Sequence, residues 1–315
     1  MTGEARTRQE ESPRDSGMSA QIPLSGPRRE MAVSGNRSQR AVESERRRDA
    51  FLGLIGMKPV IMGILNVTPD SFSDGGRFQS PVLALAQANK LVADGADIVD
   101  VGAESTRPGH TAVPLDEEWR RLEPLLAPLL AEIDAPFSID TYKAEIARRA
   151  VSLGVGVVND VWGLQRDPAM ADVVAESGAA VVIMHNRDGV DPDLDVEADI
   201  RRFFDRSLER ADRASIPRSH ILIDPGIGFG KNKAQNLRAL ALTASLRAAY
   251  GLPILIGVSR KRLFGDLLGL SVDGRLIATL AANLAALARG AAVFRVHDAA
   301  EHAAAFRVLG AIDRA

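Results

Sequence analysis

Residues 136–160 read PFSIDTYKAEIARRAVSLGVGVVND, and they contain a strand, a helix and a second strand in succession. The runs 137–140 and 155–159 are short, nearly continuous and hydrophobic, as strands buried on both faces of a parallel sheet require. Between them, Ala144, Ala147 and Val151 recur at helical spacing. The stretch therefore predicts two parallel strands joined by an amphipathic helix.

The same alternation fills the chain from residue 51 onward. Strand-like runs occur at 60–67, 98–102, 137–140, 155–159, 180–185, 221–224, 253–258 and 292–296. Helical spacing recurs between them in Leu276, Leu280, Leu284 and Leu287, and in Leu237 with Leu240. Eight strand–helix units over about 260 residues match a closed barrel in number and size. We predict the α/β class and a single (β/α)8 TIM barrel over 51–315, with a doubly wound open sheet as the alternative.

The composition of the 315-residue chain excludes several classes of protein. The chain is 46% hydrophobic and 25% charged with a net charge of −2, so it is globular and has no overall basic field for nucleic acid or anionic membranes. It has no cysteine, which excludes disulfides and cysteine-ligated metals. We find neither an apolar run long enough for a membrane span nor a secretory signal, and we predict a cytoplasmic protein.

Residues 1–50 differ in composition from the rest of the chain. They contain ten arginines and eight acidic residues but almost no periodic apolar residue. Such a segment buries too little surface to offset its ordering entropy, so we predict a disordered polar tail. The eight acidic residues argue against a transit peptide.

Polar residues follow the predicted strands. They include Asn66, Glu104, Asp140, Asn159, His185, Asp224, Lys261 and His297. The active sites of such barrels lie at the carboxyl ends of the strands, where these side chains would share one mouth. Polar groups gathered there need partners, and a bound ligand supplies them. The pattern predicts a ligand site at this end of the barrel.

Two chemical groups are distinguishable within this set. Carboxylate, amide and ammonium groups suit the edge of a flat heterocycle, and they belong to Asp140, Asn159, Asp224 and Lys261. Neutral and cationic donors suit phosphate or diphosphate, and they belong to Asn66, Thr106, Arg107, Arg295 and His297. A zinc site built from His185, His297 and Asp224 is a weaker alternative.

Three loops near these strand ends are rich in glycine. Residues 68–78 and 105–111 combine Gly and Pro with small polar residues, as in loops that close over a substrate. The third, GIGFGK at 226–231, matches neither the phosphate-binding P-loop nor the dinucleotide fingerprint in its spacing. Its glycines would instead let the backbone and Phe229 approach a ligand beside Asp224.

Several motifs in sequence order resemble those of dihydropteroate synthase, a pterin-binding TIM-barrel family. ILNVTPDSFSDGG at 64–76 resembles the first signature of the family, and GAESTRPG at 102–109 the second. SIDTYK, NDV, IMH, DPGIGFGK, SRK and RVHD follow in the family's order. The resemblance covers residues 58–312 and leaves the tail without a counterpart.

The resemblance implies a transferase of folate biosynthesis. It would join p-aminobenzoate to 6-hydroxymethyl-7,8-dihydropterin diphosphate, giving 7,8-dihydropteroate and diphosphate by a Mg²⁺-assisted dissociative substitution. The implied catalytic residues are Lys261, Arg295, His297 and Asp140. The implied pterin site is Asp140, Asn159, Met184, Asp224 and Lys261, and the diphosphate site is Asn66, Thr106, Arg107, Arg295 and His297. The implied p-aminobenzoate site is Phe72, Thr106, Pro108, Phe229 and Arg262, and the Mg²⁺ ligand is Asn66.

One residue departs from the family pattern. The resemblance implies that the p-aminobenzoate carboxylate binds at the start of the helix near Lys261, through backbone N–H groups and the side chain after this lysine. Many relatives have serine where this chain has Arg262, so we expect the backbone part of this contact rather than the side-chain part. The resemblance also implies a homodimer through the last helices and ordinary sulfonamide binding. The alternatives are a non-catalytic pterin-binding relative, a pterin-dependent methyltransferase and an unrelated phosphate-binding barrel.

Overall fold

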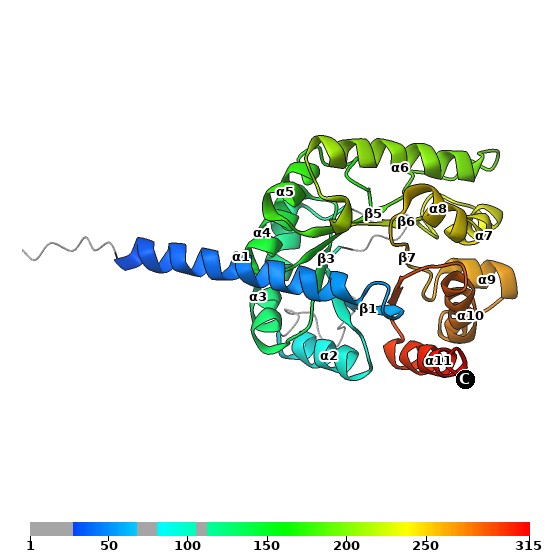
Figure 1. Cartoon of the computed structure of the whole chain (residues 1–315), viewed down its shortest axis with the longest axis horizontal. Coiled ribbons are helices and arrows are strands. Elements are labelled where there is room, and N and C mark those ends of the chain that lie inside the picture. The colour runs from blue at the N-terminus through cyan, green and yellow to red at the C-terminus, as the bar shows by residue number, and fades with distance from the viewer. Residues whose placement is uncertain (1–27, 68–80, 105–111) are drawn as a thin grey trace, which may run out of the picture.

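The structure is a computed structural model that describes residues 28–67, 81–104 and 112–315, with side chains from residue 39 onward. Strands and helices alternate along the chain (Figure 1). The strands are β1 (Val60–Asn66), β2 (Ile98–Gly102), β3 (Phe137–Asp140), β4 (Val157–Asp160), β5 (Ala180–Met184), β6 (Ile221–Asp224), β7 (Leu255–Ile256) and β8 (Val293–Val296). The helices are α1 (Arg28–Leu54), α2 (Pro81–Ala93), α3 (Leu115–Glu132), α4 (Ala144–Leu153), α5 (Met170–Ser177), α6 (Val196–Arg213), α7 (Lys233–Ala241), α8 (Thr243–Tyr250), α9 (Arg262–Leu268), α10 (Leu276–Leu287) and α11 (Ala299–Ile312).

The eight strands form one parallel sheet that closes on itself. Their order is β6-β5-β4-β3-β2-β1-β8-β7, so β1 pairs with both β2 and β8. The remaining gap is bridged by Ile223 and Ile254, and the amide of Ile223 donates to the carbonyl of Pro253 at 3.0 Å. The predicted (β/α)8 barrel is therefore confirmed, and the open doubly wound sheet is excluded.

Two hydrophobic layers stabilise the barrel. The larger layer lies between the strands and the surrounding helices, and it includes Leu122, Phe204 and Phe294. The smaller layer fills the inside of the barrel, which we call the floor. The floor consists of Phe51, Val60, Met62, Ile98, Val157, Ala180, Val182, Leu222, Leu255 and Val293, and all are fully buried. Both faces of the sheet are thus covered, which explains the continuous hydrophobic runs of the strands.

Helix α1 crosses the amino-terminal end of the barrel, and in Figure 1 it is the long blue helix that extends to the left. Ser44 donates to the carbonyl of Val155 at 2.8 Å, and Arg48 donates to that of Gly178 at 2.7 Å. These carbonyls directly precede β4 and β5. Arg47 is buried and donates to the carbonyls of Leu130 and Ile133.

The prediction of a disordered tail up to residue 50 is therefore wrong for the residues of α1. The physical reason is tertiary: Ser44 and Arg48 donate to backbone carbonyls just before β4 and β5, and Phe51 completes the floor. Residues 1–27 lie outside the described part of the chain. The barrel unit accordingly includes α1 rather than beginning at residue 51.

Helix α10 buries a different face from the one its leucines suggest. Thr279, Asn283 and Ala286 are buried, whereas Leu276 and Leu280 are only half-buried. Asn283 lies 2.9 Å from the His302 ring of α11, so the inner face of this helix is held partly by polar contacts.

Among the described helices none alone is long and apolar enough to cross a membrane. Only α9 and the segment 273–287 together reach that length, and they are bent by 82°.

Candidate active site

The functional side chains stand directly above the floor, because side chains on a strand alternate between its two faces. Each inward-facing floor residue is followed two positions later by another inward-facing residue. In this way Ile98 precedes Asp100, Val157 precedes Asn159, Val182 precedes Met184, Leu222 precedes Asp224 and Val293 precedes Arg295. Asp140 and Asn159 are paired in register across β3 and β4, and Met184 and Asp224 across β5 and β6. Polar and charged side chains thus line the mouth of the barrel, directly above the hydrophobic floor.

Arg295 joins two carboxylates on one side of this mouth. Its Nε donates to Asp100 Oδ2 at 2.6 Å, and its Nη2 donates to Asp140 Oδ2 at 2.6 Å. Asn159 donates to Asp100 Oδ2 at 3.3 Å, and Ser138 donates to Asp100 Oδ1. Asp100 is fully buried, so these donors supply the partners that its carboxylate loses with water.

Asp140 retains an acceptor that the described residues leave without a partner. Its Oδ1 is buried and has no hydrogen bond there, while Oδ2 accepts from Arg295. Burial is the main cause that raises the pKa of Asp140 to about 7, and the nearby Asp100 carboxylate adds to the rise. A buried carboxylate oxygen without a partner costs free energy, which a ligand N–H pointing into the mouth would recover.

Asp224 and Lys261 form the opposite side of the mouth. Asp224 Oδ1 accepts from the amide of Gly226 at 2.7 Å, and burial raises the pKa of Asp224. Lys261 donates to the carbonyl of Ile227 and lies 4.4 Å from the centre of the Phe229 ring. Burial lowers the pKa of Lys261 to about 8. This side therefore offers a carboxylate acceptor, a cationic donor and an aromatic wall.

The segment after β7 is held in an unusual backbone conformation. Arg260 has a φ of 54°, which is the left-handed region, and it lies between Ser259 and Lys261. Its guanidinium pairs with Asp298, and its amide donates to Thr279 of α10 at 3.1 Å. Ser259 Oγ lies 2.9 Å from Nδ1 of His297, so the ends of β7 and β8 are joined directly above the floor.

The comparisons with known proteins agree with this geometry. A family model described as pterin binding enzyme matches residues 62–297. The chain is 41% identical over 261 residues to a dihydropteroate synthase of Clostridium beijerinckii, which covers 82% of this chain and 96% of the relative. It is 40% identical over 255 residues to a dihydropteroate synthase of Bacillus subtilis, with 81% and 89% covered. The chain belongs to the dihydropteroate synthase family of pterin-binding enzymes.

Solved structures of the family have the same fold. A dihydropteroate synthase of Clostridium difficile, crystallised with pteroic acid, is 46% identical and superposes with a TM-score of 0.79 over 83% of this chain and 99% of that one. A Xanthomonas albilineans dihydropteroate synthase with 4-aminobenzoic acid is 43% identical, with a TM-score of 0.78 and coverage of 82% and 94%. The family resemblance of the sequence motifs is confirmed.

The structure brings most of the expected site residues together. Asp140, Asn159, Met184, Asp224, Lys261, Arg295 and His297 lie at the carboxyl ends of their strands, and Asn66 ends β1 with a half-exposed side chain. Arg262 lies apart, because its side chain is 89% exposed and pairs with Asp266 at 3.3 Å. Phe72, Thr106, Arg107 and Pro108 lie outside the described residues, as do all positions of the two loops expected to close, 68–78 and 105–111.

Two features of the site were missed in the sequence. Asp100 lies within an otherwise hydrophobic strand, and a charged residue at an inward-facing position was the signal available. Lys231 is 6% exposed and lies 2.7 Å from His185, whose other nitrogen lies 3.1 Å from Asp199. Both ring nitrogens of His185 therefore contact side chains of the protein, Lys231 and Asp199. The described residues contain no group of three His, Cys, Asp or Glu side chains that could hold a metal ion.

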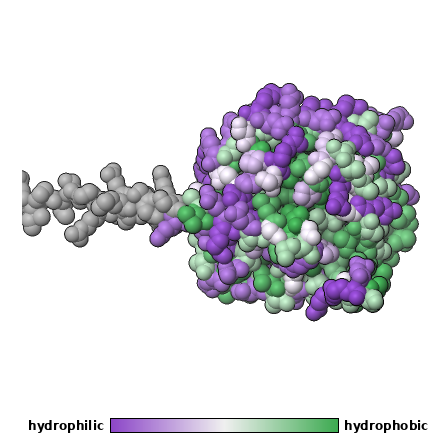
Figure 2. Space-filling view, viewed as in Figure 1, coloured by the Kyte–Doolittle hydropathy of each residue, from purple (hydrophilic) through white to green (hydrophobic). Residues whose placement is uncertain are grey.

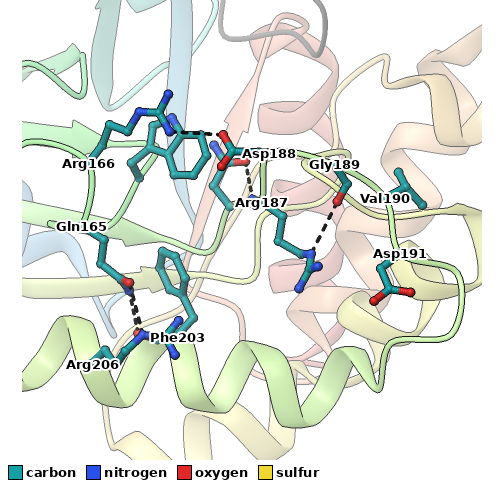
Figure 3. A pocket seen from close by; sticks show the side chains of 11 residues that line it. Gln165, Arg166, Arg187, Asp188, Gly189, Val190, Asp191, Phe203 and Arg206 are labelled. Atoms are coloured by element: carbon teal, nitrogen blue, oxygen red, sulfur yellow. Dashed lines mark hydrogen bonds and ion pairs between the residues drawn. The ribbon is translucent and has the colours of Figure 1, made fainter.

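A separate depression of about 600 Å³ lies beside the mouth (Figure 3). Trp162, Arg166, Arg187, Asp188 and Phe203 are among its lining residues. Its polar groups are largely paired with one another: Arg166 lies 3.2 Å from Asp188, and Arg187 points toward the carbonyl of Gly189 at 3.5 Å. This depression contains none of the carboxylates of the mouth, so we place the chemistry in the mouth.

Proposed function

We propose that the chain condenses 6-hydroxymethyl-7,8-dihydropterin diphosphate with p-aminobenzoate, giving 7,8-dihydropteroate and diphosphate. The observation that carries the proposal is the buried Oδ1 of Asp140, an acceptor without a partner among the described residues, in the same mouth as Asp224 and Lys261. A flat ring with several N–H groups on one edge and a carbonyl on another meets this arrangement. The relatives support it, since they are dihydropteroate synthases and two of their structures were solved with pteroic acid or 4-aminobenzoic acid.

The pterin ring would bind between the two sides of the mouth. The carboxylates of Asp140 and Asp224 and the amide of Asn159 would take hydrogen bonds from the amino-pyrimidine edge, and Lys261 would donate to the ring carbonyl. Met184 is 4% exposed at the end of β5 and would pack on the ring face. Hydrogen bonds to charged groups, at about 1.5–3 kcal/mol each, make this edge selective for a pterin.

The diphosphate would lie toward β1 and β8. His297 and Arg295 supply donors there, and Arg295 stays anchored by Asp100 and Asp140 while it does so. Thr106 and Arg107 would complete this region from the loop after β2. Because Arg295 and His297 are held in place before the substrate arrives, they would stabilise the negative charge that grows on the leaving group.

The proposed magnesium ion fits the donor set of this region. Asn66 offers a hard amide oxygen at the end of β1, and Mg²⁺ is commonly held by few protein oxygens together with substrate phosphates and water. No cluster of acidic side chains among the described residues provides a site of its own. Asn66 would therefore hold the ion together with the diphosphate. When bound, Mg²⁺ supplies charge neutralisation to that leaving group.

The carbon–oxygen bond to diphosphate would break first, because the electron-rich dihydropterin stabilises the resulting cationic methylene group. The aniline nitrogen of p-aminobenzoate then forms the new carbon–nitrogen bond and releases a proton to solvent. Phe229, with Phe72 and Pro108, would form the slot that directs the nitrogen to this carbon. No side-chain nucleophile takes part, so the contribution of the protein is orientation and electrostatic stabilisation.

The test is product formation by the purified chain with pterin diphosphate, Mg²⁺ and p-aminobenzoate, each omitted in turn. We expect dihydropteroate and diphosphate only when all three are present. Tight pterin binding without diphosphate release would favour the non-catalytic relative. Release of diphosphate without dihydropteroate would contradict the condensation, and absence of binding would contradict the proposed mouth.

We also propose a homodimer through the last helices. Exposed hydrophobic side chains gather on α9, the loop after it and α10: Leu267, Leu268, Val272 and Ile277 are 45–80% exposed. Figure 1 places α9 and α10 at the right, and the same side of the molecule in Figure 2 carries hydrophobic surface. Exposed patches of this kind commonly mark protein interfaces. Analytical sedimentation tests this proposal: we expect the wild type to sediment as a dimer and the I277D variant as a monomer. The cytoplasmic location stays a prediction.

A further inference from the structure

Lys231 is a buried cation that the proposed condensation does not use. Its Nζ donates to the carbonyl oxygen of Gly226 at 2.8 Å and to that of Phe229 at 3.1 Å, and it lies 2.7 Å from Nδ1 of His185. An ammonium group has three protons and no acceptor, so these three partners satisfy it completely. The third contact is a hydrogen bond only if Nδ1 of His185 is an acceptor.

His185 therefore has its ring proton on Nε2, which donates to Asp199 Oδ2 at 3.1 Å. Burial lowers the pKa of His185 to about 4, so the ring is neutral at pH 7, as this arrangement requires. Asp199 also accepts from Arg187 Nη1 at 2.8 Å. A chain of hydrogen bonds thus runs from the loop 225–231 through His185 to α6 and to Arg187, which is labelled in Figure 3.

The loop lies directly on the segment that carries His185. Gly226 has a φ of 67°, and a Cβ there would lie 1.8 Å from the carbonyl oxygen of His185. Gly230 has a φ of 58°, and a Cβ there would lie 2.4 Å from Cβ of Arg187. These left-handed, closely packed turns direct the carbonyl groups of Gly226 and Phe229 inward, onto the ammonium of Lys231.

The same loop places two groups of the mouth. The amide of Gly226 donates to Asp224 Oδ1 at 2.7 Å, and this bond orients the carboxylate. The ring of Phe229 lies beneath Lys261, whose Nζ donates to the carbonyl of Ile227 within the loop. A shift of the loop would therefore move a pterin acceptor and the aromatic wall together.

We infer that Lys231 is a positioning residue, which holds the carbonyls of Gly226 and Phe229 so that Asp224 and Phe229 face the substrates. His185 and Asp199 act through it by fixing its third partner. The inference rests on the proposed function, because it concerns how the same mouth binds pterin and p-aminobenzoate. The charged groups that face the ammonium are Asp224, Lys261, Asp199 and Arg187.

The test is K231M, which keeps the length of the side chain and removes its donors. We expect the KM for p-aminobenzoate and the Kd for the pterin to rise about tenfold, as for loss of a hydrogen bond from a charged group, while kcat falls less than about threefold. The matched control is K233M, two residues away and exposed on α7, with both constants unchanged. A lysine that only stabilised the fold would lower the melting temperature and leave KM and Kd of the folded enzyme unchanged. That result would overturn the inference.

Two measurements keep the inference falsifiable if K231M does not fold. D199N changes a partly exposed residue of α6 and should raise the same constants about threefold, since it weakens the chain at its far end. Nitrogen-15 spectra of the wild type at pH 7 should show the His185 proton on Nε2, with H185N for assignment. A proton on Nδ1 would refute the inference without any activity measurement. Wild-type protein that forms no product contradicts the proposed function, whereas active enzyme with unchanged constants in K231M contradicts this inference alone.

Discussion

Replacing Phe51 by alanine should destabilise the barrel and leave its chemistry intact. Phe51 is fully buried at the end of α1 and packs with Val60, Met62 and other floor residues. Truncation of a buried phenylalanine leaves a cavity and costs about 3–5 kcal/mol. At roughly 2–4 °C per kcal/mol for a chain of this size, the melting temperature should fall by about 6–20 °C.

The assay is denaturant unfolding of F51A and wild type, together with the KM for both substrates. The control is V42A on the same helix, where the side chain is 66% exposed and the expected change in free energy of unfolding is within about 0.5 kcal/mol. The KM values of F51A should stay within about twofold of wild type, because floor residues separate Phe51 from the mouth. A loss of stability below about 1 kcal/mol would refute the role of α1 as part of the barrel, and a large rise in KM would refute the separation of floor and mouth.

Three further predictions concern the mouth. D140N should weaken pterin binding about 10–100-fold in calorimetry, because an amide replaces the ionised acceptor; unchanged affinity would contradict the assignment of Asp140. The kcat/KM for the pterin should fall below about pH 7, where Asp140 gains a proton, and above about pH 8, where Lys261 has lost its proton. A flat profile from pH 6 to 9, or an acid limb retained in D140N, would count against these groups. Mg²⁺ titrated into the chain alone should give no heat beyond dilution, whereas added diphosphate should create a site that N66A loses; binding without diphosphate would show a metal site that the protein forms by itself.

Most of the barrel was predictable because its strands are buried on both faces and therefore appear as unbroken hydrophobic runs. All eight predicted runs contain or overlap an observed strand, and the polar residues that follow them meet at one end. The helix that precedes β1 was not predictable in the same way. Ser44 and Arg48 of this helix donate to backbone carbonyls just before β4 and β5, and no periodicity of apolar residues predicts such contacts.

The pairing within the site was also hidden from the sequence. Arg295 was expected to face an anion, and the structure places its guanidinium between Asp100 and Asp140. Asp100 lies in the middle of a strand rather than at its end, so the pattern of polar residues that follow the strands does not include it. Lys231 stands in a recognisable motif, but the partners of its ammonium come from its own backbone and from a histidine 46 positions earlier.

The two-residue offset between floor and mouth also bears on how such a chain tolerates insertions and deletions. An insertion after the last strand residue lengthens a loop and leaves the strand's inward face unchanged. A single deletion between Ile98 and Asp100, or between Leu222 and Asp224, would instead turn the carboxylate outward among the helices. Length variation in descendants of this sequence should therefore accumulate beyond the strand ends, while the pairs of floor and mouth residues keep their spacing.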